Sequence, residues 1–162
     1  MEFCKSLGVF TANDGIVYPI KRKGFSPYQL CSESIKKDVI DAVKYLWPFI
    51  DDAYILKNYP GGNDVFYIYS FEDKVIGCVS VDRSNFHPYI SNLFVVPDER
   101  GKGKSIDLLV HAEIFIEMLG FDMMYLWCDQ ELVQFYENKG WFINEDKKVV
   151  DDKTIYIMKK NI

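Results

Sequence analysis

The chain has 162 residues, of which 49% are hydrophobic and 16% aromatic, enough to build one ordinary domain with a buried core. Nineteen Lys and Arg stand against twenty-four Asp and Glu, and the formal net charge is −5. This balance excludes a generic nucleic-acid-binding surface, because phosphates call for a basic face, and the apolar content excludes disorder. We therefore expect a single domain over residues 1–162.

Targeting and metal-binding signals are missing from the sequence. No apolar run approaches the roughly 18 residues of a membrane span, and Met1–Lys5 lacks the start of a secretory signal. The four cysteines are scattered without a CxxC pair, and two histidines are present, so no metal site is expected. Cys78 and Cys128 lie in apolar runs and should be buried. We expect a cytoplasmic protein with no membrane partner.

The N-terminal third of the chain carries few signals of regular structure. Ile16–Tyr18 indicates a short strand. Residues 32–50 predict a helix, because apolar side chains recur there at helical spacing. Ser32 or Ser34 can cap the start of this helix, and Pro48 ends or kinks it.

The middle of the chain alternates strands and a helix. Residues 65–71 and 75–81 are β-rich runs around a short polar turn and predict a hairpin, followed by a third strand over 89–96. A helix with a clear apolar stripe is expected over 105–119, and Gly120 ends it.

The C-terminal part continues the same pattern. We expect a strand over 123–128, a short helix over 131–139 that Gly140 ends, and strands near 141–143 and 154–159. The order predicts an α/β (α+β) fold. Its central sheet is mixed and mostly antiparallel, is flanked by helices, and contains a central βαβ unit.

The loop between the third strand and the long helix carries the chemistry. It reads Arg100-Gly101-Lys102-Gly103-Lys104-Ser105. The two glycines let a ligand approach the backbone, the first helical amides face outward, and three cations stand within five residues of an acidic protein. These features predict a phosphate or pyrophosphate site; the alternative is a solvated turn with a serine cap.

One phosphate-binding class fits this loop poorly. Gly103–Ser105 imitates the end of a nucleotide P-loop, and Tyr125–Asp129 imitates a strand that ends in a magnesium-holding Asp. The P-loop requires a glycine five residues before Gly103, where this chain has Asp98. That carboxylate would face the phosphates, so the sequence disfavours an NTPase.

A second class fits better. Val96–Gly103 resembles motif A of the GNAT superfamily of N-acetyltransferases, written Q/R-x-x-G-x-G/A, with Ser105 in place of the last small residue. Phe135–Trp141 resembles the F-Y-E-K-x-G-F segment of that family, and Val75–Gly77 is also similar. The resemblance covers residues 65–143 and implies a GNAT fold with the pyrophosphate loop in its βαβ unit.

The resemblance implies acetyl-CoA as the cofactor. Its pyrophosphate would be held by the backbone amides of the loop residues Arg100, Gly101, Lys102, Gly103, Lys104 and Ser105. The pantetheine would pair with the preceding strand around Phe94, Val95 and Val96. Ser105 is a mild departure, since its side chain could cap the helix, touch phosphate or crowd the cofactor.

Two catalytic roles follow from the resemblance. The reaction would be direct attack of a neutral amine on the thioester in a ternary complex, with the backbone N–H near Val95 as donor to the developing oxyanion. Tyr136 matches the tyrosine that protonates the departing thiolate, and a phenol with a pKa of about 10 is protonated at neutral pH. The alternative for Tyr136 is core packing, because Leu132, Phe135 and Tyr136 share a helix face.

The resemblance leaves two routes for the amine proton. Many family members place a Glu on the strand before the loop, where this chain has Ser91 and Asn92, and neither is a strong base. The proton could leave through ordered water or to Asp129, whose alternative role is to cap the helix over 131–139. His87 precedes a proline and is expected at the surface.

The sequence therefore predicts an N-acetyltransferase that acts on a primary amine of a small molecule or a peptide. The alternative is a catalytically weak or inactive GNAT-fold module that binds acyl-CoA. The long helix has a second apolar stripe that would contact the N-terminal helix or the second subunit of a homodimer: Ile106, Val110, Ile114 and Met118. The acceptor is set by residues 20–65 and the loop near Asn85, where no motif is readable.

Overall fold

The computed structural model describes residues 9–11, 17–19, 24–28, 31–46, 64–72, 74–82, 87–150 and 152–162. Within these ranges, β1 (Val9–Thr11) and β2 (Val17–Pro19) form a small antiparallel pair. The main sheet has seven strands in the order β3-β4-β5-β6-β7-β9-β8. They are β3 (Phe25–Pro27), β4 (Asp64–Phe71), β5 (Lys74–Asp82), β6 (Tyr89–Val95), β7 (Met123–Asp129), β8 (Phe142–Val150) and β9 (Lys153–Asn161).

The helices are α2 (Glu33–Leu46), α4 (Lys104–Met118) and the short α5 (Val133–Glu137), with 3-10 turns η2 (Pro97–Glu99) and η3 (Gln130–Leu132). Neighbouring strands of the main sheet are antiparallel except β6 and β7, which are parallel and are linked by α4. The predicted mixed, mostly antiparallel sheet with a central βαβ unit is therefore confirmed. No helix of the described residues is long and apolar enough to cross a membrane.

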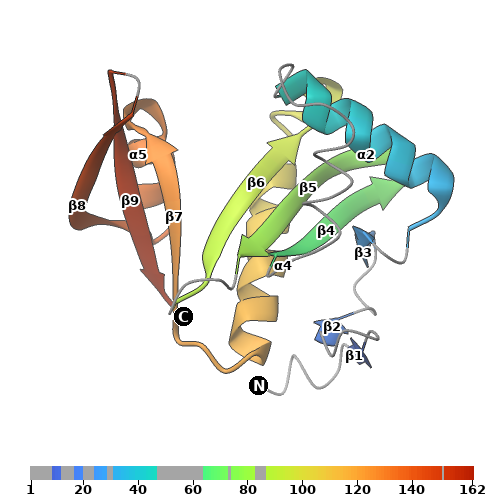
Figure 1. Ribbon diagram of the computed structural model, residues 1–162, viewed down its shortest axis with the longest axis horizontal. Coiled ribbons are helices and arrows are strands. Elements are labelled where there is room, and N and C mark those ends of the chain that lie inside the picture. The colour runs from blue at the N-terminus through green and yellow to red at the C-terminus, as the bar shows by residue number, and fades with distance from the viewer. Residues whose placement is uncertain are drawn as a thin grey trace.

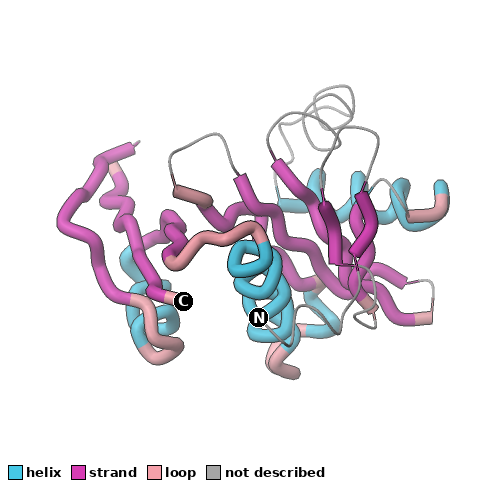
Figure 2. The backbone as a smooth tube through the Cα atoms, turned by 90° about the horizontal axis from the view of Figure 1, so that it is seen from below, coloured by secondary structure: helices cyan, strands magenta, loops and turns pink. Residues whose placement is uncertain are grey.

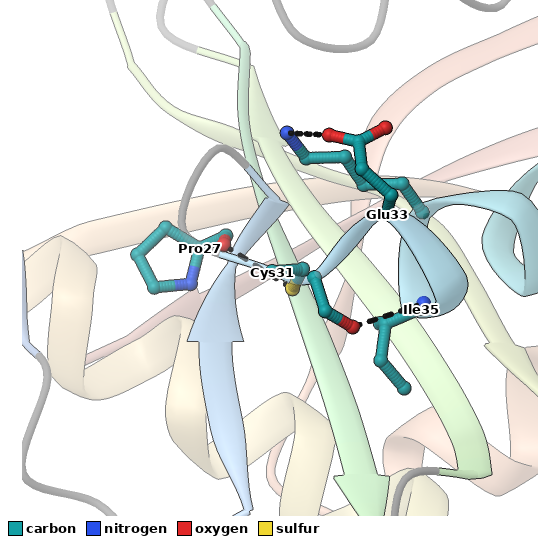
Figure 3. A network of polar contacts seen from close by, with 6 residues as sticks. Pro27, Cys31, Glu33 and Ile35 are labelled. Atoms are coloured by element: carbon teal, nitrogen blue, oxygen red, sulfur yellow. Dashed lines mark hydrogen bonds and ion pairs between the residues drawn. The ribbon is translucent and has the colours of Figure 1, made fainter.

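The start of α2 follows the sequence prediction (Figure 3). The Ile35 backbone N–H donates to the Ser32 hydroxyl at 3.3 Å, so Ser32 is the cap. Just before it, the Cys31 thiol donates to the carbonyl of Pro27 at 3.4 Å, which ties the helix to β3. The helix ends at Leu46, and the remainder of the predicted helix lies outside the described residues.

Two apolar clusters cover opposite faces of the sheet. On the α4 face, strand side chains such as Val79, Met124 and Met158 pack against α4 side chains such as Leu108 and Phe115. On the α2 face, the strand residues Ile68, Cys78 and Phe94 pack against Ile35 and Val39 of α2. Adjacent residues of β5 point to opposite faces, as strand geometry requires. Cys78 and Cys128 are buried, as predicted.

The long helix is confirmed with one-residue differences at its ends. Gly120, with φ of 93°, ends the helix in a Schellman motif. The Gly120 N–H donates to the carbonyl of Glu117, and the Phe121 N–H donates to the carbonyl of Ile116. Of the second apolar stripe, Ile106 and Val110 are exposed and Ile114 is buried. Because α2 covers the other face of the sheet, packing of this stripe on α2 is wrong; the homodimer stays a prediction.

Several strand boundaries differ from expectation. Strands β1 and β3 are not predicted by the sequence, and β2 lies one residue later than expected. Strand β8 continues to Val150 although residues 144–148 are polar, because it is an edge strand that pairs with β9 alone. The predicted helix over 131–139 is divided into η3 and α5.

The central feature of the sheet is the separation of β6 from β7. They pair in parallel at Tyr89 with Tyr125 and at Ile90 with Leu126, and then diverge (Figure 1). Figure 2 shows α4 lying between the C-terminal strands with α5 on one side and the remaining strands on the other. The divergence opens the sheet beside the N-terminal end of α4.

Candidate active site

A cleft of about 690 Å³ lies between the diverging strands on the α4 side. Three segments form it: the end of β6, the loop that leads into α4, and the turn and helix after β7. The lining residues are Leu93, Phe94, Val95, Glu99, Arg100, Gly101, Gly103, Lys104, Ser105, Ile106, Leu132, Phe135 and Tyr136. The structure thus brings most of the sequence-predicted site residues together in one cavity.

The loop backbone requires its two glycines. Gly101 and Gly103 both have left-handed backbones, with φ of 77° and 76°. A Cβ added at either would meet no atom within 4 Å, so the space beside both is open. Gly103 is the N-cap of α4, and within the described chain no side chain caps this end. The first amides of α4 are therefore available to an anion.

This geometry corrects the role considered for Ser105 as a helix cap. The helix begins at Lys104, one residue earlier than predicted, and Gly103 occupies the N-cap position. Ser105 is the second helical residue and lines the cleft.

The three loop cations differ in their surroundings. The Arg100 Nε donates to the carbonyl of Val95 at 2.8 Å, and its guanidinium carbon lies 5.5 Å from the centre of the Phe94 ring. The Lys104 ammonium lies 5.4 Å from the centre of the Tyr69 ring. Both line the cleft, whereas Lys102 forms an exposed ion pair with Glu99 at 3.6 Å and is not among the lining residues described. Arg100 thus ties the loop to β6.

The backbone of β6 faces the cleft at Val95. The Val96 N–H donates to the Ile76 carbonyl of β5 at 2.9 Å. Because backbone groups alternate in direction along a strand, the N–H and C=O of Val95 point away from β5, into the gap left by β7. This is the arrangement needed to pair with an extended ligand. Val96 itself is outside the described lining.

A bulge interrupts β6 just before this point. The β5–β6 register shifts between Cys78 and Ser80, and Asn92 has a left-handed φ of 51°. The Asn92 amide donates to the buried Ser80 hydroxyl at 2.9 Å, and the Ser80 and Ser91 hydroxyls are 2.8 Å apart. Sequence reasoning considered Ser91 and Asn92 as positions for a base and missed Ser80, which has no motif; a serine within an apolar strand was its one signal.

Tyr136 is packed in the core and also faces the cleft, and its role as the acid stays a prediction. Its side chain is 7% exposed and belongs to the apolar cluster on the α4 face, with edge contacts to Phe135 and Trp141. It also lines the cleft. Burial raises the pKa of its phenol to about 12, and the neighbouring Cys128 thiol adds to the rise. The phenol is therefore protonated at neutral pH.

Two other candidates lie away from the cleft. Asp129 is exposed and starts η3 without a side-chain cap bond in the described chain, and it lines a separate hollow with Glu131, Asp152 and Lys153. His87 is half-buried rather than fully at the surface, with its ring 5.4 Å from that of Tyr125. Asp129 as base stays a prediction.

The chain matches one family model, described as an acetyltransferase (GNAT) domain, over residues 37–162. No curated protein matches its sequence significantly.

Among solved structures, an aminoglycoside 6'-N-acetyltransferase complexed with coenzyme A has a TM-score of 0.73 at 16% identity, covering 85% of this chain and 96% of its own. The aminoglycoside 6'-N-acetyltransferase from Enterococcus faecium has a TM-score of 0.72 at 16% identity, with the same coverage. A putative N-acetyltransferase from Lactobacillus plantarum has 0.67 at 18%, covering 85% and 94%. At these identities the likeness establishes the fold.

Proposed function

Since the chain belongs to the GNAT family of acetyltransferases, we propose that it transfers the acetyl group of acetyl-CoA to a primary amine of a small molecule or a peptide. One observation carries the proposal: the cleft between β6 and β7 is lined both by the loop whose uncapped α4 amides can bind an anion and by the Tyr136 phenol. Acetyl-CoA supplies an activated acyl group as its thioester.

The residues of the cleft suit this cofactor. The open space at Gly101 and Gly103 and the charges of Arg100 and Lys104 fit a pyrophosphate. The outward C=O of Val95 accepts from the Arg100 Nε with one lone pair and has the second for an amide N–H of pantetheine. Because the Arg100 Nε holds the Val95 carbonyl, the loop and the strand are oriented as one unit.

The catalytic roles follow from the same positions. The Val95 N–H would donate to the acyl oxygen as negative charge develops there. Tyr136 would give its proton to the departing thiolate as the new C–N bond forms and the C–S bond breaks. The amine proton would leave through water near Ser91 or to a carboxylate such as Asp129, which lies outside the cleft lining.

The test is incubation with acetyl-CoA and a panel of primary amines while free thiol is followed. We expect Tyr136→Phe to slow thiol release at least about 100-fold, the usual contribution of a positioned acid. Tyr28→Phe is the matched control, because Tyr28 is another buried tyrosine but packs in the cluster under α2. An unchanged rate in Tyr136→Phe would remove Tyr136 from the acid role.

Calorimetry with CoA tests the proposal independently. Binding of CoA without thiol release across the panel would support the inactive acyl-CoA-binding module instead. Failure to bind CoA would contradict both functions.

A further inference from the structure

Aromatic side chains gather on the α2 face at the point where β6 and β7 separate. Tyr89 of β6 and Tyr125 and Trp127 of β7 point to this face, because the alternating residues Ile90 and Leu126 are buried in the cluster under α4. Trp127 is 53% exposed, which is unusual for so large an apolar side chain. The sequence analysis assigned none of these three residues a role.

The three rings contact one another, and we call this group the aromatic corner. Tyr89 and Tyr125 are nearly parallel, at an interplanar angle of 27° and a centroid distance of 5.3 Å. Trp127 stands perpendicular to Tyr89, at 89° and 6.2 Å. This edge contact leaves much of the indole open to solvent, since Trp127 is 53% exposed, and a cation within about 6 Å of an aromatic face is attracted to it, most strongly by Trp.

The corner lies across the sheet from the proposed acetyl site. Trp127 is the first residue of β7 beyond the last parallel pair, Ile90 with Leu126, and Ser91 is its counterpart on β6. The cleft with Tyr136 lies on the α4 side of the same divergence. A molecule held at the corner would reach the acyl carbon from the side opposite to α4.

The charges around the corner favour a cation. Asp82 of β5 is the register partner of Tyr89, and Asp129 follows Trp127 by two residues on the same face and is exposed. Lys159 is the partner of Tyr125 on β9, and its ammonium lies over the Phe142 ring at 5.5 Å. A carboxylate thus neighbours Tyr89 on β5, and another neighbours Trp127 along β7.

We propose that this corner binds a cationic group of the acceptor, so that the acceptor is a primary amine with an ammonium or quaternary ammonium group a few carbons away. Trp127 and Tyr89 determine this specificity. The inference rests on the proposed acetyl transfer, since it concerns the second substrate of that reaction.

A pair of probes with one shape and different charge tests it. The first is (5-aminopentyl)trimethylammonium, and the second is 6,6-dimethylheptylamine, in which carbon replaces the quaternary nitrogen. Their dissociation constants are measured by calorimetry on protein saturated with CoA. Both probes carry the same primary amine and differ only in the quaternary charge, so we expect the quaternary probe to bind about tenfold more tightly, as a partly desolvated cation on aromatic faces should.

The variants separate the corner from the rest of the protein. Trp127→Leu and Tyr89→Leu should each reduce the preference to below about twofold, while Trp127→Phe retains part of it. Phe71→Leu is the matched control, because Phe71 is a 57% exposed aromatic at the distant end of β4, and it should keep the full preference. The dissociation constant of CoA should stay unchanged in all four variants and reports that they are folded.

Three results would overturn the inference: no binding of the quaternary probe, equal affinity for the two probes, or a preference that persists in Trp127→Leu. Each leaves acetyl transfer to other amines intact. Failure of the proposed function is visible separately, as absence of CoA binding or of thiol release in the wild-type protein.

Discussion

The glycines of the loop before α4 combine a backbone requirement with open space. Gly101 and Gly103 have φ of 77° and 76°, and a Cβ at either meets no protein atom within 4 Å. Gly120 at the other end of α4 shares both properties, with φ of 93°, but does not line the cleft. These residues therefore allow backbone strain to be separated from ligand contact.

We expect Gly103→Ala and Gly120→Ala to lower the free energy of unfolding by a similar amount, about 1–2 kcal/mol, because both place a Cβ on a left-handed residue. Gly103→Ala should also raise the KM for acetyl-CoA about tenfold, a loss of about 1.4 kcal/mol of binding, because the methyl group would occupy the cleft. Urea unfolding and initial rates measure the two effects. An equal KM increase in Gly120→Ala would mean that strain, not contact, is responsible.

The buried phenol of Tyr136 makes stability depend on pH in alkaline solution. Its pKa is raised from 10.0 to about 12, so between these pH values the unfolded chain loses the proton and the folded chain keeps it. The free energy of unfolding therefore falls as pH rises through this window, by about 1.4 kcal/mol per pH unit. Below pH 10 the contribution is fully present.

We expect the wild-type protein to lose about 1 kcal/mol more stability than Tyr136→Phe between pH 10 and pH 11. Burial also raises the pKa of Cys78 to about 12, but this thiol is present in both proteins and its effect cancels. Urea unfolding at the two pH values gives the difference. Equal losses in both proteins would show that the phenol titrates normally in the folded state.

At the scale of elements, the bulge in β6 depends on a serine of the neighbouring strand. Ser80 is fully buried and accepts a hydrogen bond from the Asn92 amide, next to the Ser91 hydroxyl. We expect Ser80→Ala to cost about 1–3 kcal/mol of stability, because it removes a buried partner from polar groups. It should also lower kcat more than it changes the CoA dissociation constant, since the bulge directly precedes the strand end at Val95.

Ser91→Ala is the control for this variant. The Ser91 side chain is half-buried, so water can replace its hydroxyl, and the loss of stability should stay below about 1 kcal/mol. Denaturant unfolding and thiol-release kinetics of both variants decide the matter. If the two variants behaved alike, the bulge would be held by the backbone rather than by Ser80.

The interior elements are the ones that sequence patterns predict. Strands β4 to β7 and helix α4 lie within two residues of their expected boundaries, because their apolar periodicity reflects burial against α2 and α4. The edge strands lack this apolar periodicity, so β3 is not predicted and β8 is predicted only near its start. Strand β3 has three residues and ends in a proline, and β8 is polar over 144–148 because it needs no alternation at an edge.

The same distinction applies to the site. The loop at residues 100–105 is readable because its conformation and charge demand particular residue types in sequence order. The aromatic corner of Tyr89 and Trp127 is not, since it depends on the register of two strands that lie far apart in the chain. The split of the predicted helix into η3 and α5 likewise depends on how the chain leaves β7.

For the molecule as a whole, the cleft lies between two groups of elements that share one core. Strands β3 to β6 with α2 and α4 form one group, and β7 to β9 with α5 form the other. The groups meet through the two parallel pairs of β6 and β7 and through a common apolar cluster that contains Val79, Leu108, Met124 and Met158. This shared core predicts that the described elements unfold together in one transition.

CoA should stabilise both groups at once, because the cleft takes Val95 and Arg100 from one and Tyr136 from the other. At a CoA concentration of about 100 times its dissociation constant, binding adds about 2.7 kcal/mol to the free energy of unfolding. For a chain of 162 residues this raises Tm by about 5–10 °C in a single transition. Calorimetric scans measure it, and Gly103→Ala should need about tenfold more CoA for the same shift. Two transitions, of which CoA moves one, would contradict the shared core and would place the ligand on one group alone.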